Sequence, residues 1–256
     1  YLDFRNFDNY LDDVSKFEPD VLFHLGAHTD LEYCERNIDD TYITNTLSVE
    51  NAVRISNELS IPLVFISTAG IFDGKKIFYD DWDHPNPLGH YAKSKYAAEK
   101  FIQYNCNKYL ICRAGWMMGG GPEKDKKFVN KIYKQIVKGN KELFVVKDKL
   151  GTPTYTHDFV KNLFKILESG HLGLYNLVCE GNTSRLEVAK EILITLNLES
   201  KISIKAVNSD YFSTKFFAPR PKSENLINYK LNLRSLNIMR DWRVCLREYL
   251  NNEFKI

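Results

Sequence analysis

Short apolar runs alternate with helical patterns through the first half of the chain, and this alternation restricts the fold more than any other feature of the sequence. Three runs, at residues 20–26, 63–67 and 109–113, are rich in Val, Leu, Ile and Phe. Because each run is apolar on both of its faces and helical patterns separate the runs, a parallel sheet with helices on both sides is predicted. The predicted fold class is therefore α/β, with a doubly wound parallel sheet.

The other segments fit around such a sheet. Helices are predicted, in chain order, at residues 9–17, 39–59, 91–104, 126–138 and 157–168. A further sheet strand is predicted at 174–178 and a separate short strand at 143–146, with a loop at 119–122 and a turn at 151–154. The last part, residues 183–256, alternates less regularly and is expected to build a smaller lobe.

Small or hydroxylated residues stand where the first three predicted strands end. These pairs are Gly26-Ala27, Ser67-Thr68 and Ala114-Gly115. In parallel α/β sheets, ligands bind beyond the carboxyl ends of the strands. We therefore expect the three segments to converge on one binding crevice.

A tyrosine and a lysine follow the second strand end at the start of a predicted helix. Tyr91 and Lys95 are four residues apart, so their side chains project from the same helix face. A free tyrosine has a pKa near ~10, and a nearby positive charge lowers that pKa, which makes proton transfer efficient near neutral pH. With the hydroxyl of Thr68, the pair predicts a proton donor beside a reacting carbonyl oxygen.

The spacing alone is a weak signal, because Tyr96/Lys100, Tyr104/Lys108 and Tyr211/Lys215 share it. Only Tyr91 follows both a strand-terminal Ser-Thr and a turn, residues 85–89, that can start a helix. An aromatic residue at a helix start beside a solvated lysine is the alternative interpretation of the pair.

Composition excludes several classes of function. The 35 basic and 33 acidic residues give a net charge of +2 with no charged tail, which argues against binding to nucleic acid or to a membrane surface. The cluster of Lys124, Lys126 and Lys127 is interpreted as a solvated helix start, with an anion contact as the alternative. Five widely spaced cysteines without a Cys-x-x-Cys motif predict neither a disulfide framework nor a metal site, and they favour a reducing cytoplasm. No apolar run approaches the length of a membrane span.

One expected motif does not occur. The chain holds no Gly-x-x-Gly-x-x-Gly or Gly-x-Gly-x-x-Gly, and it begins with Tyr rather than Met. We expect it to be the remainder of a longer protein, whose missing part holds the first strand, the phosphate-binding turn and the first helix of a dinucleotide fold. Without that turn the chain is expected to bind a dinucleotide poorly or not at all.

Several motifs in the same order resemble the extended short-chain dehydrogenase/reductase family, and within it the group of dTDP-4-dehydrorhamnose reductase and its relatives. They are Gly26-Ala27-His28-Thr29 with Cys34-Glu35, Ser67-Thr68, Phe72-Asp73-Gly74, residues 85–95, residues 113–119, residues 151–154, and Arg220-Pro221 with Ser223. The resemblance implies a Rossmann-like fold with a dinucleotide-binding domain (1–115 and 155–179) and a substrate-binding lobe (116–154 and 180–256).

The resemblance also implies a catalytic group and a cofactor, NADP or NAD. Thr68, Tyr91 and Lys95 would be catalytic, with Tyr91 as the proton donor and Lys95 also on a cofactor ribose. The other implied cofactor contacts are Asp3 and Phe4 near the adenine, Gly26, Ala27 and Thr29 along the dinucleotide, and Ala114 and Gly115 at the nicotinamide. Asn45 would hold a water that links Lys95 to solvent, with a polar residue on a solvated helix face as the alternative.

Substrate contacts follow from the same resemblance. Thr68 and Trp116 would face the sugar, and Arg220 would bind the diphosphate, since a guanidinium grips such oxygens with two donors. Where the family usually has Asp-Tyr directly after the catalytic threonine, this chain has Ala69-Gly70. The implied reaction is hydride transfer to a keto group of a nucleotide-linked deoxysugar, in the synthesis of cell-surface polysaccharide.

Two hypotheses of function remain open at this point. The first is the reductase, in the cytoplasm, with a nucleotide sugar as its partner and a homodimer as one possible assembly. The second is a non-catalytic sugar-nucleotide-binding or regulatory subunit of the same fold, suggested by the missing Asp-Tyr pair and glycine-rich turn. Because a pure scaffold would have no reason to keep all three catalytic side chains, the sequence favours the enzyme.

Overall fold

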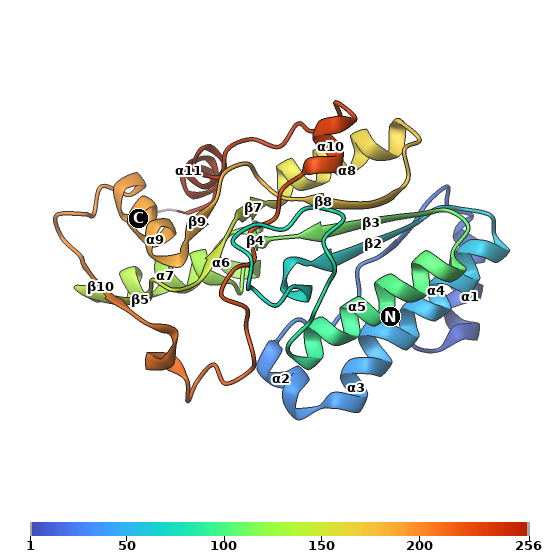
Figure 1. Ribbon diagram of the computed structural model, residues 1–256, viewed down its shortest axis with the longest axis horizontal. Helices are drawn as coiled ribbons and strands as arrows, with labels where there is room; N and C mark the ends of the chain where they lie inside the picture. The colour runs from blue at the N-terminus through green and yellow to red at the C-terminus, as the bar shows by residue number, and fades with distance from the viewer. Residues whose placement is uncertain (1, 255–256) are drawn as a thin grey trace.

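A parallel sheet of four strands forms the centre of the structure, a computed structural model that describes residues 2–254 (Figure 1). The strand order is β1 (Leu22–His24), β2 (Leu63–Thr68), β3 (Tyr109–Ala114) and β8 (Gly173–Leu177). Thr68 pairs in register with Ala114, and Ala114 pairs with Leu177. All four carboxyl ends therefore lie along one edge of the sheet, as the alternating pattern predicts.

Helices cover both faces of this sheet. One face packs on α1 (Phe7–Phe17), α4 (Ser48–Glu58) and α5 (His90–Asn105), which lie together below the strands in Figure 1. The other face packs on α8 (Thr156–Glu168), which lies above them. β2 and β3 are buried on both faces, as expected for strands that are apolar throughout.

The first predicted strand is shorter and less buried than its composition suggests. Only Leu22–His24 is extended within the predicted range of 20–26. Leu22 and His24 are buried, whereas Phe23 and Leu25 are 37% and 65% exposed. The prediction of burial on both faces is therefore wrong for β1, although the ring of Phe164 in α8 approaches that of Phe23 (6.0 Å between centroids).

The helix predicted at 39–59 is continuous but changes its winding. It consists of α3 (Ile38–Tyr42), a π-helical turn η1 (Ile43–Leu47) and α4, with a short helix α2 (Leu31–Arg36) ahead of it. Wide turns of this kind are rare and often occur at functional sites. Asn45 lies at the centre of this turn.

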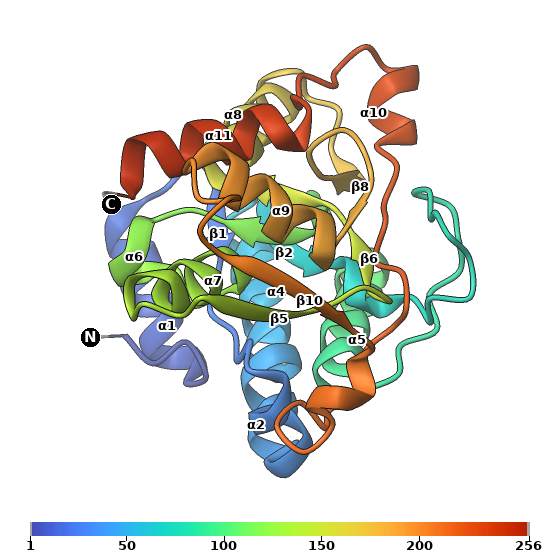
Figure 2. The same cartoon turned by 90° about the vertical axis from the view of Figure 1, so that its left-hand side faces the viewer.

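The second half of the chain builds the remaining elements around three small two-stranded sheets (Figure 2). β5 (Glu142–Val146) pairs with β10 (Ser203–Val207), β4 (Trp116–Met118) with β7 (Pro153–Tyr155), and β6 (Leu150–Gly151) with β9 (Thr183–Ser184). The predicted turn at 151–154 is thus the junction of two short strands. The helices of this half are α6 (Gly121–Lys124), α7 (Phe128–Val137), α9 (Arg185–Thr195), η3 (Ser209–Phe212), α10 (Tyr229–Leu233) and α11 (Trp242–Glu253), and one further short helix, η2 (Ala69–Ile71), follows β2.

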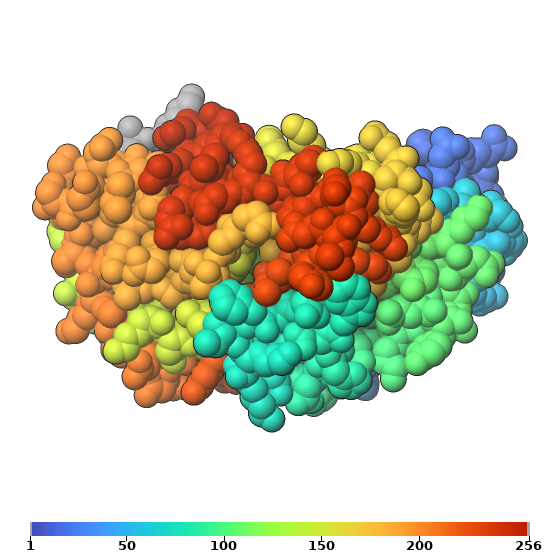
Figure 3. Space-filling model, turned by 45° about the horizontal axis from the view of Figure 1, so that its top comes forward, coloured from blue at the N-terminus to red at the C-terminus, as the bar shows by residue number. Residues whose placement is uncertain are grey.

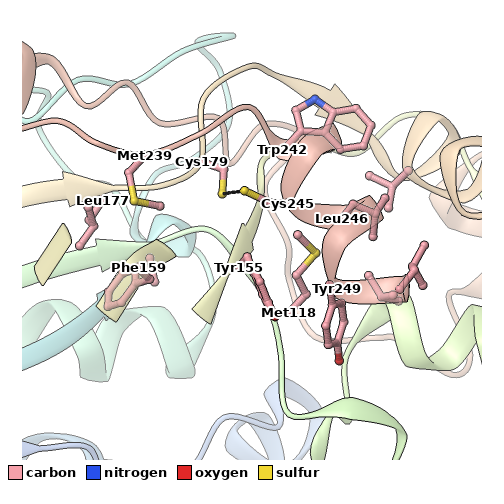
Figure 4. Packing of buried hydrophobic residues seen from close by; sticks show 14 of the residues in the cluster. Met118, Tyr155, Phe159, Leu177, Cys179, Met239, Trp242, Cys245, Leu246 and Tyr249 are labelled. Carbon is pink, nitrogen blue, oxygen red and sulfur yellow. Dashed lines mark hydrogen bonds between the residues drawn. The ribbon is translucent and has the colours of Figure 1, made fainter. Parts of the chain in front are cut away.

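One apolar core joins the upper face of the sheet to α7, α9 and α11. Figure 4 shows Trp242, Cys245 and Tyr249 of α11 beside Met118 of β4 and Tyr155 of β7. Trp242 is fully buried. All five cysteines are buried and unbridged, including Cys179 and Cys245, whose sulfurs lie 3.5 Å apart. Within residues 2–254, no helix is both long enough and apolar enough to cross a membrane.

Two irregular segments, residues 72–89 and 216–228, run side by side across the molecule (Figure 3). Tyr79 pairs with Leu226, and the Ser223 hydroxyl donates to the backbone oxygen of Ile77. The second segment also runs along β6, since Glu224 N donates to Leu150 O at 2.9 Å. These contacts bring the late Arg-Pro motif to the end of the sheet that β2 and β3 share.

Candidate active site

Thr68 is the last residue of β2 and caps the short helix η2. Its Oγ1 accepts a hydrogen bond from Gly70 N at 3.1 Å. Because β2 and β3 end together, Thr68 lies beside Ala114 at the edge of the sheet. The predicted strand-end hydroxyl is therefore fixed by local backbone geometry.

Tyr91 and Lys95 lie on the first two turns of α5. The helix begins at His90, whose backbone N–H donates to Glu35 Oε1 at 2.6 Å. A carboxylate at a helix N-terminus stabilises it by satisfying an unpaired donor. Lys95 is only 4% exposed, and Tyr91 is half-buried. The solvated lysine of the alternative interpretation is thus absent at this position.

Burial sets the protonation of both groups. Desolvation raises the pKa of Tyr91 to about 12, although a hydrogen bond from Thr68 acts in the opposite direction. Desolvation lowers the pKa of Lys95 to about 7, with the Glu99 charge opposing it. A lowered pKa for Tyr91 was expected from the sequence, but in this structure burial outweighs the effect of neighbouring charges.

Lys95 keeps its donors free. Its Nζ lies 3.8 Å from the centroid of the Phe65 ring, and it forms no hydrogen bond or ion pair with any residue in 2–254. A buried ammonium without a carboxylate is costly, so it indicates a position selected for a ligand or for chemistry. Lys95 therefore joins Thr68 and Tyr91 in one candidate active site.

Asn45 ties three segments of this site together. Its Oδ1 accepts from His28 N at 2.8 Å, and its Nδ2 donates to His28 O at 3.0 Å and to Ser94 Oγ at 3.2 Å. Asn45 is fully buried, so the alternative of a solvated helix face is wrong. Its side chain joins the segment after β1 to the helix that bears Tyr91 and Lys95.

The predicted cofactor residues group at the ends of β1 and β3. The Phe4 ring lies on Gly26 so closely that a Cβ there would be 2.4 Å from it, and Asp3 is paired with Arg5 at 2.8 Å. Ala27 follows Gly26 directly, half-buried. At the other strand, Ala114 is buried, and Gly115 packs against the backbone of Thr152.

Thr29, the last of the predicted cofactor residues after β1, is exposed. The Lys127 ammonium donates to its hydroxyl at 3.4 Å. All three lysines of the predicted basic cluster are exposed, as expected, and Lys127 also reaches across to the segment after β1. Desolvation lowers the pKa of Lys127, and the neighbouring Lys131 adds to this effect.

Trp116 marks the predicted sugar side, and it contacts two residues that the sequence did not single out. Its Nε1 donates to Glu224 Oε2 at 2.7 Å, and the Arg185 guanidinium lies 3.6 Å from its ring centroid. Gly151 is needed below the ring, since a Cβ would come within 2.3 Å of it. Glu224 stands directly after Ser223 of the Arg-Pro motif, but nothing in the local sequence around Arg185 indicates a site.

Arg220 is close to these residues but is not free. It forms a two-pronged ion pair with Glu32 of α2, with distances of 2.8 and 2.9 Å. Lys131, Lys149 and Arg185 are each close enough to Arg220 to be repelled by its charge. Burial lowers the pKa of each of these three groups, and Arg220 lowers it further by repulsion. Four cations from separate segments thus face one region.

The two histidines near β1 are structural. His24 lies between Tyr10 OH and Ser48 Oγ, both at 3.2 Å, and burial lowers its pKa to about 3. His28 Nε2 pairs with Asp40 Oδ2 at 2.7 Å. Among residues 2–254, no group of three or more His, Cys, Asp or Glu side chains is arranged to hold a metal ion.

The residues present fit the nicotinamide end of a dinucleotide. The unpaired donor of Lys95 suits a ribose hydroxyl, and the small residues Ala114 and Gly115 leave the end of β3 without a protruding side chain. When bound, the cofactor would supply a hydride, which no side chain of the site can provide.

Known proteins are similar to this chain in sequence and in fold. The family described as the RmlD substrate binding domain matches residues 1–254. The spore coat polysaccharide biosynthesis protein SpsK of Bacillus subtilis is 30% identical over 91% of this chain and 80% of its own length. The dTDP-4-dehydrorhamnose reductase of Escherichia coli is 28% identical over 98% of this chain and 86% of its own length.

Solved structures give the same result. A dTDP-4-dehydrorhamnose reductase from Bacillus anthracis, in complex with NADP, superposes with a TM-score of 0.91 at 29% identity. The match covers 98% of this chain and 86% of that structure. UDP-glucose 4-epimerase from Thermus thermophilus has a TM-score of 0.79 at 18% identity and covers 98% of this chain and 82% of its own, which shows a shared fold alone.

Proposed function

The chain belongs to the family of the RmlD substrate binding domain, and from this premise we propose that it is an NAD(P)H-dependent reductase of a nucleotide-activated keto-deoxysugar. The observation that supports this most strongly is the hydrogen bond between Tyr91 and Thr68 at the carboxyl end of β2, with the buried Lys95 one turn further along α5. The reaction is one step in the synthesis of a polysaccharide, in keeping with the name of the Bacillus subtilis relative.

Each of the three side chains has a distinct task. The raised pKa of Tyr91 keeps its phenol protonated at neutral pH, so it can donate a proton to the carbonyl oxygen as that oxygen gains negative charge. Thr68, beside the phenol, holds the same oxygen by a hydrogen bond. Lys95 holds a ribose hydroxyl and, when charged, stabilises the phenolate that remains after proton transfer.

The four cations Lys131, Lys149, Arg185 and Arg220 support a substrate with a diphosphate. Phosphate oxygens accept several charge-assisted hydrogen bonds, and arginine binds them with two donors. Cations that repel one another and are partly buried gain most from such an anion, because it relieves the repulsion. A dTDP-linked sugar, as named for the relatives, fits this requirement.

The chain would divide into two ligand-binding domains. Residues 1–115 and 155–179 would bind the dinucleotide, and residues 116–154 and 180–256 would bind the sugar nucleotide, although positions 1 and 255–256 lie outside the described structure. We place the enzyme in the cytoplasm, since five unbridged cysteines suit a reducing compartment. We propose no contact with nucleic acid or membrane, and a homodimer as a possible assembly.

The test is oxidation of NADPH and NADH by the complete protein with dTDP- and UDP-linked 4-keto-sugars. We expect turnover with at least one nucleotide keto-sugar and none with the free keto-sugar that lacks the nucleotide. If no nucleotide keto-sugar is reduced with either cofactor, although both ligands bind, then the non-catalytic alternative replaces this proposal.

A further inference from the structure

Glu224 brings a carboxylate to the place that Ala69-Gly70 leaves open. Its Oε1 lies 3.4 Å from the point where a Cβ on Gly70 would stand, and Thr68 Oγ1 lies at the same distance from that point. The two oxygens are therefore at most twice this distance apart. Residue 70, as a glycine, places no side chain at that point.

The Glu224 carboxylate is held on one side only. Its Oε2 accepts from Trp116 Nε1 at 2.7 Å, whereas its Oε1 accepts no hydrogen bond from any residue in 2–254. Charged oxygens that are partly buried normally have several donors. Glu224 Oε1 is therefore free to accept a hydrogen bond from a ligand near Thr68.

The backbone around Glu224 is fixed from both sides. Glu224 N donates to Leu150 O at 2.9 Å, and the oxygen of the next residue, Asn225, accepts from Tyr79 N at 2.9 Å. The Trp116 ring is fixed in turn between Gly151 and the Arg185 guanidinium. A carboxylate with this support keeps one position, which is what recognition of a ligand requires.

Charge links Glu224 to the reacting groups. Its negative charge raises the pKa of Tyr91 and that of Arg185, so both side chains are near it. Glu224 therefore lies between the proton donor and the cations that suit the diphosphate. In a nucleotide sugar, the sugar ring is the part that connects the reacting carbonyl to the diphosphate.

We propose that Glu224 is a specificity-determining residue, whose Oε1 accepts a hydrogen bond from a sugar hydroxyl close to the keto carbon. This inference rests on the proposed function, and it names the chemical feature that the site selects: a hydroxylated sugar ring rather than a ring that lacks that hydroxyl.

The test separates recognition of the sugar from recognition of the nucleotide. Binding of dTDP and of dTDP-rhamnose to the complete protein is measured by calorimetry for the wild type and for Glu224→Ala, Glu224→Gln and Glu224→Asp. Glu187→Gln on α9, a half-exposed carboxylate paired with Lys190, is the matched control. A hydrogen bond to a charged group corresponds to roughly a ten- to hundredfold change in affinity.

We expect Glu224→Ala to weaken dTDP-rhamnose binding by that factor and to leave dTDP binding within about twofold of the wild type. Glu224→Gln keeps the bond to Trp116, so its affinity for dTDP-rhamnose should lie between those of the wild type and Glu224→Ala. Glu224→Asp should also bind dTDP-rhamnose more tightly than Glu224→Ala does. In turnover, KM for the keto-sugar should rise more than kcat falls. An equal effect on dTDP and dTDP-rhamnose, or no effect on either, overturns the inference.

The outcomes also separate this inference from the proposed function. If the wild type reduces no keto-sugar but Glu224→Ala still weakens the sugar nucleotide selectively, the recognition role stands and the reductase does not. If turnover occurs and Glu224→Ala is kinetically indistinguishable from the Glu187→Gln control, the reductase stands and the role of Glu224 is wrong.

Discussion

Lys95 is the residue at which stability and activity conflict. It is buried beside the Phe65 ring with no carboxylate partner, and its pKa is lowered from 10.5 to about 7. The unfolded chain therefore binds a proton between pH 7 and 10.5 that the folded chain does not bind. Over this window the free energy of unfolding rises with pH by about 1.4 kcal/mol per unit.

Substitution of Lys95 by methionine should consequently stabilise the protein and inactivate it. At pH 7, Lys95→Met should raise the free energy of unfolding by roughly 4 kcal/mol, and the difference from wild type should shrink to roughly 2 kcal/mol at pH 9. Urea unfolding at several pH values measures this difference. Lys93→Met, an exposed lysine on the same helix, is the control and should show no such trend. A pH-independent difference for Lys95→Met would contradict the account.

The residues of this site differ in how far the sequence could reveal them. The sequence pattern places Thr68 at the end of a strand, and it places Tyr91 and Lys95 on one face of the next long helix. These three residues could therefore be predicted to belong to one site. Glu224 meets Trp116 across 108 positions, and that contact depends on how an irregular segment crosses the sheet. The two-pronged pairing of Arg220 with Glu32 was likewise not predictable, since it joins an irregular segment to the short helix α2 across 188 positions.

At the scale of elements, a buried ion pair holds α5 against β3. Glu99 is fully buried and Arg113 is 4% exposed, with 2.9 Å between Glu99 Oε2 and the Arg113 guanidinium. Glu99 lies one turn beyond Lys95, so this pair fixes the rotation of the helix that bears Tyr91. Removal of one partner leaves an uncompensated charge in the core.

Glu99→Met should therefore lower the free energy of unfolding by roughly 3–5 kcal/mol, and Arg113→Leu by a similar amount. The double variant Glu99→Met/Arg113→Leu should lose far less than the sum, because no lone charge remains. Urea unfolding of the four proteins gives the coupling. Additive losses in the double variant would show that the pair is not coupled as the structure indicates.

Element boundaries show where sequence patterns reach their limit. The strands β2, β3 and β8 and the helices α1, α5 and α8 could be predicted, because their apolar periodicity matches their burial. The π-helical turn at Ile43–Leu47 could not, since its residues continue a helical pattern and only the bonds of Asn45 to His28 distinguish it. β1 was predicted too long, because apolar composition does not indicate which strand faces are covered.

At the scale of the whole molecule, residues 209–224 form a strap that joins the small sheets to α2 (Figure 2). The ion pair of Arg220 with Glu32 is its polar anchor, and the Arg36 guanidinium over the Phe217 ring (4.9 Å) adds a second contact. A diphosphate on Arg220 would have to share or displace Glu32. Binding of the substrate to Arg220 would thus affect the contact between the strap and α2.

Glu32→Gln should therefore tighten binding of dTDP several-fold, because the competing carboxylate charge is removed, whereas Arg220→Ala should weaken it. The cost in stability should stay near 0–1 kcal/mol, as for other partly exposed pairs. Calorimetric titration with dTDP measures both effects, and Glu187→Gln again serves as the control. Unchanged affinity in both variants would remove Arg220 from the substrate site.

The central claim is that Tyr91 donates the proton, and a single substitution tests it most directly. Tyr91→Phe removes only the phenol oxygen, while Tyr96→Phe makes the same change one turn away on α5, at a tyrosine that also has a lysine four residues on. With the nucleotide keto-sugar that the wild type reduces, the account predicts a fall in kcat by roughly 10²–10⁴ for Tyr91→Phe, with cofactor affinity kept and Tyr96→Phe close to wild type. A Tyr91→Phe enzyme that turns over at the wild-type rate would contradict it.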